Sequence, residues 1–514
     1  MRFRTIGLAI VGIGLAFAAP AARGETPAGA VAGEITSEAC IHKGADADYD
    51  AQCGVLYVPE NRADPGSRLI ALPYRRIKAL SEKPGEPLFF FNGGPGSSNM
   101  SFRRLISWFI EDRDIVLLGY RGVDGTTQLD CPEVDAEMRS GGEMLSRESL
   151  ARFSDAYRRC AERLTQSGID LDGYTILDVV DDAEALRAAL GYERIDLMSV
   201  SYGTRVAMIY AWRYPDRTFR NAMISVNPPG HFRFDPARLE AQIRRYAALC
   251  AADAYCASRT DDLAGDIETA LANMPQRWLF LPVNRDAVLF ASFMSLFSVN
   301  GAASTFDMWM AAADGDYSGM ALVSAVAGMM TPSDMLWGDF AAKGLSADLD
   351  FDPHADYSRE LRPGEHLFGS PGNVLGWAAA GGWPAHKMPG EYRMAAPSDI
   401  ETLMVSGSLD VSTPAENAKD DLLPLMPTAR QVTLAEFSHA GDLLFLEPEA
   451  SRRLIAGFYL TGDVDDSEFS YRPVDFRPGW KSYPLLAKAL LGGAGAIILL
   501  FVWLGAFIAR RIRR

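Results

Sequence analysis

The chain has 514 residues, of which 48% are hydrophobic and 10% aromatic. This composition excludes a disordered chain, and the length allows either one large domain with an insertion or two domains. The formal net charge of −16 makes nucleic acid and anionic lipid head groups unfavourable partners.

The first 24 residues have the layout of a secretory signal peptide. Arg2 and Arg4 precede an apolar run over residues 6 to 17, and small residues follow as far as Gly24. The apolar run is shorter than the roughly 20 residues that span a bilayer, so we expect residues 1 to 24 to be removed on export. A buried N-terminal helix is the alternative interpretation.

Short apolar runs bounded by turn residues alternate with helical patterns through much of the chain. We predict strands over residues 54–59, 69–77, 87–91, 115–118, 195–200, 221–226, 401–405 and 430–434, and helices over residues 181–190, 204–212 and 448–459. Strands that alternate with helices predict an α/β fold, with a mostly parallel sheet and helices on both of its faces.

A glycine-rich loop, NGGPGSS, follows the predicted strand at residues 87 to 91. Glycines let the backbone approach a bound group closely, whereas Pro95 has no N–H to donate. We therefore assign the N–H of Gly94 as a donor to a bound oxyanion. A plain tight turn is the alternative.

Residues 199 to 203, SVSYG, place Ser201 at a corner between a buried strand and a helix. The pattern resembles the GxSxG nucleophile elbow, in which a serine stands on a strained strand-to-helix turn. Ser199 replaces the first glycine of that motif. If Ser201 attacks a carbonyl, the N–H of Tyr202 is the second oxyanion donor. An ordinary turn between strand and helix is the alternative.

Residues 231 to 395 break the alternation of strands and helices. They contain helical patterns, several tryptophans and segments rich in glycine and proline, without the period of a strand. We predict a helical cap inserted after the sixth strand. The α/β core would then consist of residues 25 to 230 and 396 to 462.

A nucleophilic serine needs a base, and an acid that orients the base, in the chain order Ser, Asp or Glu, His. Among the six histidines only His439 follows a late strand, and a surface histidine is the alternative. Asp410 ends the preceding strand, where a carboxylate would fix the tautomer of the imidazole. Its alternative is a turn residue or a helix cap. Asp442 is a weaker candidate for the acid because it does not end a strand.

The end of the chain has the pattern of a membrane anchor. Residues 489 to 509 are uncharged and long enough to span a bilayer, and residues 510 to 514 include four arginines. The positive-inside rule predicts a cytoplasmic tail and a body outside the inner membrane. Residues 463 to 488 are interpreted as a polar juxtamembrane spacer. A core helix with a basic end is the alternative.

The six cysteines predict three disulfides, because their number is even and the chain is expected to be exported. Neighbours in the sequence suggest the pairs Cys40–Cys53, Cys131–Cys160 and Cys250–Cys256. Other pairings remain open, and free buried thiols are the alternative. No CxxC pair or Cys/His cluster has the spacing of a zinc site, so we expect no metal.

Five segments resemble exported α/β-hydrolases of the tripeptidyl aminopeptidase and proline iminopeptidase type: NGGPGSS, YRGVDG, SVSYGTR, SGSLDVSTP and FSHAGD. The resemblance covers residues 50 to 230 and 395 to 462. It implies an α/β-hydrolase fold with a helical cap, no cofactor, and release of amino acids or short peptides from free N-termini.

The resemblance also assigns roles to individual residues. It implies Ser201 as nucleophile, Asp410 as orienting acid, His439 as base, and Gly94 and Tyr202 as oxyanion donors. The chain departs from the family pattern at three positions, where Gly119 stands in place of an aspartate and Ser199 and Ser438 stand in place of glycines.

The predicted function is a membrane-tethered serine hydrolase that forms an acyl-enzyme, with an aminopeptidase as the leading interpretation. An aminopeptidase binds a cationic amino terminus, for which Glu365, Asp339 and Asp352 are candidates among which the sequence does not choose. A carboxylesterase or other ester or amide hydrolase on the same scaffold is one alternative. A non-catalytic membrane-anchored binding protein is another.

Overall fold

The computed structural model describes residues 27, 29–140, 142–327 and 335–493. The predicted signal peptide lies outside the described residues, as do residues 494 to 509 of the predicted spanning segment and the tail that follows. Within the described ranges, no helix combines the length and the apolar character that crossing a bilayer requires.

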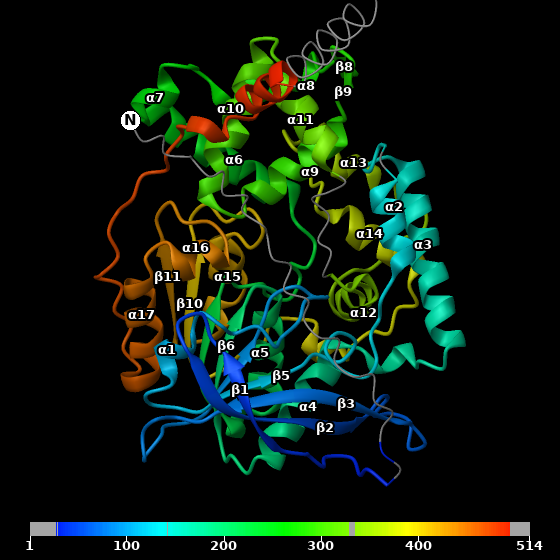
Figure 1. The fold of residues 1–514 in the computed structure, drawn as a ribbon, viewed down its shortest axis with the longest axis vertical. Helices are drawn as coiled ribbons and strands as arrows, with labels where there is room; N and C mark the ends of the chain where they lie inside the picture. The colour runs from blue at the N-terminus through cyan, green and yellow to red at the C-terminus, as the bar shows by residue number, and fades with distance from the viewer. Residues whose placement is uncertain (1–26, 28, 141, 328–334, 494–514) are drawn as a thin grey trace, which may run out of the picture.

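A nine-stranded sheet forms the centre of the molecule (Figure 1). Its strands are β1 Glu38–Lys43, β2 Asp48–Pro59, β3 Leu69–Ile77, β4 Leu88–Phe91, β5 Ile115–Leu118, β6 Ile195–Val200, β7 Thr218–Ile224, β10 Glu401–Gly407 and β11 Ala429–Leu434. The spatial order is β1-β2-β3-β5-β4-β6-β7-β10-β11. Pairing is antiparallel from β1 to β5 and parallel from β5 to β11, so the predicted mostly parallel sheet is confirmed. Strand β1 was not predicted.

Helices cover both faces of this sheet. One face carries α1 Ile106–Phe109, α16 Ala440–Phe445 and α17 Pro448–Thr461, and the other carries α4 Ile176–Ala189, α5 Tyr202–Arg213 and α15 Ala415–Asp421. The short strand β4 shows why both faces are needed. Leu88 and Phe90 pack under the first set of helices, whereas Phe89 and Phe91 pack under the second. A strand buried on both faces is apolar at every position, which explains its continuous apolar sequence.

A helical cap lies above the carboxyl ends of the parallel strands in Figure 1. Between β7 and β10 it contains α6 Pro236–Ala252, α7 Ala254–Ala257, α8 Leu263–Ala272, α9 Arg285–Ser295, α10 Ala302–Ala313, α11 Ser318–Val326, α12 Trp337–Ala347, α13 Ser358–Leu361 and α14 Asn373–Gly382. A short hairpin of β8 Arg277–Trp278 and β9 Leu281–Pro282 interrupts these helices. Strands this short leave no periodic signal in the sequence.

Two further helices belong with the cap, although the sequence analysis placed their residues in the α/β core. They are α2 Pro132–Arg139 and α3 Arg147–Gln166, and both pack in the same apolar cluster as the cap helices. A Cβ at Gly382 would lie 1.9 Å from the carbonyl oxygen of Ser154, so α14 and α3 are in close backbone contact. Trp337 of α12 donates its indole N–H to Asp135 of α2 (2.8 Å). The apolar face of α3 does not pack on the sheet. It is buried against the cap helices instead.

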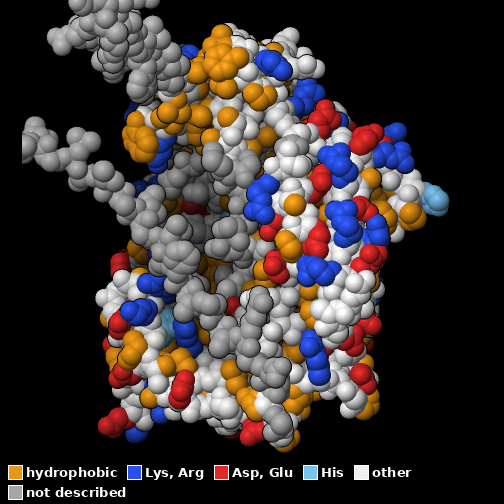
Figure 2. Space-filling model, turned by 45° about the vertical axis from the view of Figure 1, so that its right-hand side comes forward, with side chains coloured by type: hydrophobic (Ala, Val, Ile, Leu, Met, Phe, Trp, Pro, Cys, Tyr) orange, Lys and Arg blue, Asp and Glu red, His pale blue; other side chains and the backbone are white. Residues whose placement is uncertain are grey.

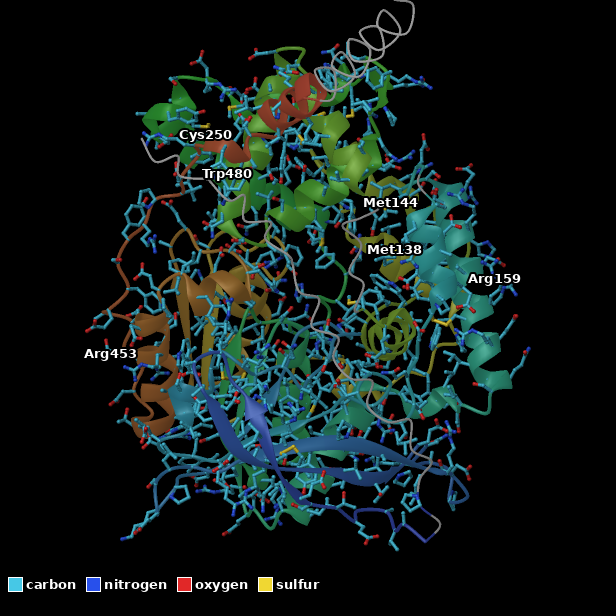
Figure 3. All side chains as sticks on the ribbon, viewed as in Figure 1. Met138, Met144, Arg159, Cys250, Arg453 and Trp480 are labelled. Atoms are coloured by element: carbon cyan, nitrogen blue, oxygen red, sulfur yellow. A yellow bond between two sulfur atoms is a disulfide. The ribbon has the colours of Figure 1, made fainter. Side chains whose placement is uncertain are left out.

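The chain after α17, predicted as a polar juxtamembrane spacer over residues 463 to 488, packs along the body of the protein. It runs from α17 to the far end of the cap, where Figure 3 labels Trp480 near Cys250. Val474 and Phe476 are buried along this path. Ser482 then donates a hydrogen bond to Asp307 of α10 (2.6 Å). Buried apolar side chains and hydrogen bonds to the cap therefore hold this segment against the body.

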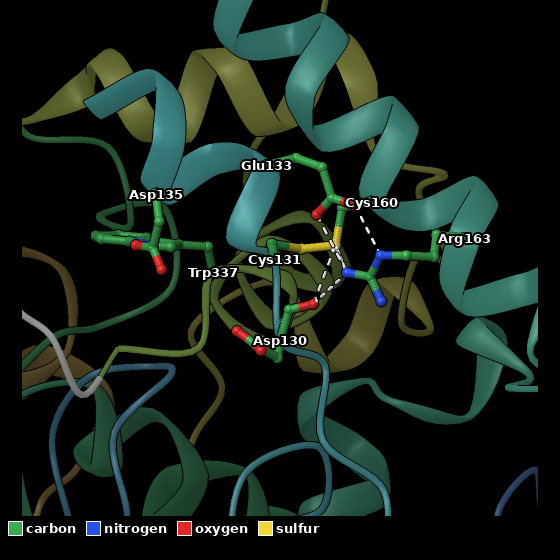
Figure 4. Close-up of a disulfide and its surroundings, with 7 residues drawn as sticks. All are labelled: Asp130, Cys131, Glu133, Asp135, Cys160, Arg163 and Trp337. Atoms are coloured by element: carbon green, nitrogen blue, oxygen red, sulfur yellow. Dashed lines mark hydrogen bonds and ion pairs between the residues drawn. A yellow bond between two sulfur atoms is a disulfide. The ribbon is translucent and has the colours of Figure 1, made fainter. Parts of the chain in front are cut away.

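All six cysteines form disulfides, in the predicted pairs Cys40–Cys53, Cys131–Cys160 and Cys250–Cys256. Figure 4 shows that the second pair joins the start of α2 to α3. Beside it, Arg163 donates to the carboxylate of Glu133 (2.7 Å) and to the carbonyl oxygen of Asp130 (2.7 Å). Glu133 lies close to both sulfur atoms, but an oxidised pair offers no thiolate to a metal ion.

Acidic and basic side chains are interspersed over much of the face in Figure 2, whereas hydrophobic side chains gather at the cap end. The tip of the β8–β9 hairpin contributes Leu279 and Phe280, each 68% exposed. Trp480, Leu485 and Leu490 are also exposed.

Candidate active site

Ser201 stands at the corner between β6 and α5, and its backbone is strained. Its φ of 53° and ψ of −124° lie in a region that residues with a side chain rarely adopt. Its N–H donates to the carbonyl oxygen of Ile224 on β7 (2.8 Å), which holds the corner at the end of the sheet. Strain of this kind persists only where the surroundings fix it, and it collects at functional sites.

The residues around the corner leave no room for larger side chains. A Cβ at Gly203 would lie 2.1 Å from the carbonyl oxygen of Phe91, and one at Gly93 would lie 3.1 Å from Cβ of Ser201. Ser199 replaces a glycine of the motif without this conflict. Its buried side chain turns toward β7, where the hydroxyl donates to the carbonyl oxygen of Ala222 (3.4 Å).

The structure brings Ser201, His439 and Asp410 together. His439 Nε2 lies 3.0 Å from Ser201 Oγ, and His439 Nδ1 lies 2.8 Å from Asp410 Oδ2. Asp410 follows β10 and His439 follows β11, as predicted. With Nδ1–H donating to Asp410, Nε2 is free to accept the proton of the serine hydroxyl, which is the arrangement of a nucleophilic triad.

Asp410 is fully buried, and both oxygens of its carboxylate accept hydrogen bonds. Oδ1 accepts from the N–H groups of Ser412 (2.9 Å) and Thr413 (2.8 Å), and Oδ2 accepts from the Thr413 hydroxyl (2.8 Å) and from His439. Burial by itself raises the pKa of Asp410. The neighbouring His439 and the Thr413 donors outweigh burial and hold the pKa below its ordinary value. The carboxylate therefore stays ionised and keeps the imidazole oriented.

The predicted oxyanion donors lie on the two segments that border the serine. Tyr202 is the first residue of α5, and the glycine loop contacts Ser201 through Gly93. Within the described part of the chain, the N–H groups of Gly94 and Tyr202 donate to no acceptor. Both donors are therefore available to a bound group, and their role as oxyanion donors stays a prediction.

Gly119 stands where the family pattern has an aspartate, and Asp124 supplies a carboxylate nearby instead. Asp124 accepts from the N–H groups of Asn99 (2.9 Å) and Tyr120 (2.8 Å) and from the Ser98 hydroxyl. A Cβ at Gly119 would lie 2.5 Å from Cβ of Asp124. The glycine thus makes room for Asp124, so the departure from the family pattern does not deprive the glycine loop of a carboxylate.

The cap also holds the glycine loop, through a buried ion pair on α12. Asp339 Oδ2 accepts from the N–H of Gly96 (3.0 Å), and its other oxygen pairs with Lys343, one helical turn along. Lys343 Nζ donates in addition to the carbonyl oxygen of Arg121 (3.0 Å). Burial raises the pKa of Asp339 and lowers that of Lys343.

Two of the acidic residues considered in the sequence analysis thus have structural partners of their own. Asp339 is fully buried against Lys343 and is not available to bind an amine, whereas Glu365 and Asp352 are exposed. Asp442 does not bond to the imidazole of His439. Its carboxylate accepts from Ser298 and Val299 of the cap instead. The sequence offered only a weak signal for Asp339, its i,i+4 spacing from Lys343.

Asp410→Asn tests the triad through the reactivity of Ser201. We expect the rate of labelling by a fluorophosphonate probe to fall on the order of 10⁴-fold, because an amide holds the wrong imidazole tautomer. Asp420→Asn on α15, which removes an exposed carboxylate, is the matched control.

The effect of Asp410→Asn on the free energy of unfolding should depend on pH. Because the folded-state pKa of Asp410 lies below its ordinary value of 3.8, its contribution is complete above that value and is lost as the pH falls through the folded-state pKa. Denaturant unfolding should therefore show an advantage of the wild type over Asp410→Asn at pH 7 that shrinks below about pH 4. A difference independent of pH would contradict the pKa shift.

Asp339→Asn tests the buried ion pair. The single substitution should cost about 3–5 kcal/mol of unfolding free energy, because it leaves Lys343 buried without an anion. The double variant Asp339→Asn/Lys343→Met should recover most of that loss, since the amide introduced at position 339 can still accept from the N–H of Gly96. Urea unfolding measures both variants, and a double variant no more stable than the single one would exclude a charge-pairing role.

Comparison with known proteins finds one family and several curated relatives. Residues 86–266 match the family described as alpha/beta hydrolase fold. The serine protease Hip1 of Mycobacterium tuberculosis is 31% identical over 232 residues, which cover 40% of this chain and 42% of that protein. The tripeptidyl aminopeptidase of Streptomyces lividans is 29% identical over 197 residues, which cover 35% and 36%. The chain thus spans less than half the length of these relatives.

A solved structure shares the fold at low similarity. The alpha/beta hydrolase MGS-M2, from a Medee basin deep-sea metagenome library, has 13% identity and a TM-score of 0.37, over 78% of this chain and 97% of that one. That similarity carries no inference about function. The sequence matches and the observed sheet agree, and the predicted resemblance is confirmed over the matched region. The chain has an α/β-hydrolase fold, and residues 86–266 match the family of that description. Part of the chain is similar in sequence to the serine protease Hip1 and to the tripeptidyl aminopeptidase.

Proposed function

We propose that the protein is a serine hydrolase that acts as an aminopeptidase, releasing amino acids or short peptides from free N-termini. The contact of His439 with both Ser201 (3.0 Å) and Asp410 (2.8 Å) carries the hydrolase part of the proposal. The peptidase part is supported by the names of the two relatives, a serine protease and a tripeptidyl aminopeptidase.

The mechanism follows from this geometry. His439 Nε2 takes the proton of Ser201 while Oγ attacks the carbonyl carbon of the substrate, and the developing oxyanion lies between the N–H groups of Gly94 and Tyr202. His439 then donates the proton to the leaving amine, and an acyl-enzyme remains on Ser201. Water activated by the same imidazole hydrolyses it. Asp410 stays ionised throughout and stabilises the imidazolium.

Matched peptide arylamides test the aminopeptidase assignment. The full chain should cleave arylamides that have a free amino terminus and leave their N-acetylated counterparts intact, because an aminopeptidase requires the cationic terminus. Ser201→Ala should lose the cleavage, as the nucleophile is removed. If simple esters are cut and neither peptide set is, the aminopeptidase assignment is wrong and an esterase takes its place.

We further propose that the protein is exported and anchored in the inner membrane by residues 489 to 509, with the C-terminus in the cytoplasm. The uncharged sequence of that segment and the four arginines after it support the proposal. So does the position of exposed apolar side chains at the cap end, where Leu485 is 55% and Leu490 is 63% exposed. An anchored cap end would bring these side chains to the lipid surface.

Cell fractionation tests the anchor. The full chain should remain with membranes after alkaline carbonate washing, whereas a chain ending after Lys488 should be released. Ending there retains the ion pair between Lys488 and Asp316 of the cap (2.6 Å), so the body keeps its packing. Release of the full chain by the wash would show that the segment is no anchor.

A further inference from the structure

A short segment of the cap, Leu296 to Val299, lies directly on the loop that carries the catalytic histidine. It connects α9 with α10 and is bonded to the loop through its backbone. The N–H of His439 donates to the carbonyl oxygen of Phe297 (3.1 Å), and the hydroxyl of Ser438 donates to that of Leu296 (2.7 Å). A glycine at position 438, as in the family pattern, could not make the second bond.

Asp442 fixes the same segment from the other side. Its carboxylate accepts from the Ser298 hydroxyl (2.7 Å), from the N–H of Val299 (2.8 Å) and from the N–H of Ser438 (3.2 Å). The side chain is only 3% exposed. Hydrogen bonds to a buried carboxylate are stronger than those between neutral groups. These hydrogen bonds therefore fix the 296–299 segment relative to the catalytic loop as well as to the cap.

This attachment places the ring of Phe297 beside the imidazole. The two ring centroids are 5.1 Å apart. Behind Phe297, the ring of Phe293 lies at 5.2 Å and packs in turn on Phe234 at 5.0 Å. Phe293 is buried, whereas Phe297 remains partly exposed. A partly exposed aromatic ring that packs on buried neighbours can offer apolar surface to a ligand.

The direction of the reaction identifies which part of the substrate meets that surface. His439 Nε2 must come within hydrogen-bond reach of the leaving group in order to protonate it. The leaving group must therefore come close to the imidazole, whose ring centroid is 5.1 Å from that of Phe297. The acyl part lies on the side of the oxyanion donors.

We propose that Phe297 is a specificity-determining residue that selects substrates with an apolar group immediately after the scissile bond, and that Asp442 is the residue that positions it. For a peptide substrate this group is the side chain of the first residue released with the leaving amine. The proposal rests on the hydrolase function proposed above, and it applies to ester and peptide substrates alike.

Substrates that differ only in the leaving group test the proposal. One series keeps a butanoyl group and varies the alcohol among methanol, butanol and benzyl alcohol. A second keeps one N-terminal tripeptide and varies the next residue among Leu, Phe, Ser and Asn, in a single mixture quantified by mass spectrometry. Comparing kcat/KM between variant and wild type removes differences in intrinsic reactivity.

Phe297→Ala should lower the ratio of kcat/KM for benzyl over methyl esters by about tenfold, the scale of one lost apolar contact in a pocket. Phe297→Leu should retain most of the ratio. Phe280→Ala, on the exposed tip of the β8–β9 hairpin, is the control and should leave the ratio unchanged. An unchanged ratio in Phe297→Ala would overturn the proposal.

Asp442→Ala should lower the same ratio, although Asp442 does not face the substrate. Ser298→Ala removes one of its three hydrogen bonds and should shift the ratio in the same direction by a smaller factor, even if Asp442→Ala fails to fold. Ratios equal to the wild type in Ser298→Ala and in folded Asp442→Ala would exclude the positioning role. Cleavage of esters but not peptides would disprove the aminopeptidase function, while the ester series still decides the role of Phe297.

Discussion

The strained corner at Ser201 is the constraint on which the site depends. Its backbone is held by a hydrogen bond to β7, by the close approach of Gly203 to Phe91, and by the contact with Gly93. Because these contacts come from β7 and from the end of β4 with its loop, the serine cannot relax without disturbing the end of the sheet. The hydroxyl is therefore presented to His439 before any substrate binds, and the reorganisation needed for attack is small.

The cap is part of this site. Two buried carboxylates join the cap to the α/β core. Asp339 of the cap helix α12 bonds to the glycine loop of the core, and Asp442 of the core helix α16 bonds to the 296–299 segment of the cap. Each accepts one backbone N–H across the interface, so the loops that flank Ser201 are positioned by cap and sheet together. A cap that opened as a rigid lid would have to break both sets of bonds and expose two desolvated carboxylates.

The departures from the family pattern have separate physical explanations. Ser199 directs its side chain away from the corner, Gly119 makes room for Asp124, and Ser438 bonds to the cap through its hydroxyl. None of the three removes a group of the triad. The serine at position 438, where the family pattern has a glycine, adds the hydrogen bond from its hydroxyl to the carbonyl oxygen of Leu296. It therefore ties the catalytic loop to the 296–299 segment.

The sequence by itself determined the features that depend on short stretches of chain. The strands around the corner and the order of Ser201, Asp410 and His439 follow from local apolar patterns and turn residues. The three disulfides join cysteines that are neighbours in the sequence, as the simplest pairing suggested. Tertiary structure alone decided the rest: that α2 and α3 join the cap, that residues 463 to 488 pack back onto it, and that Asp442 bonds to Ser298. These contacts join residues far apart in the chain, and no local pattern encodes which buried surface a given face will meet.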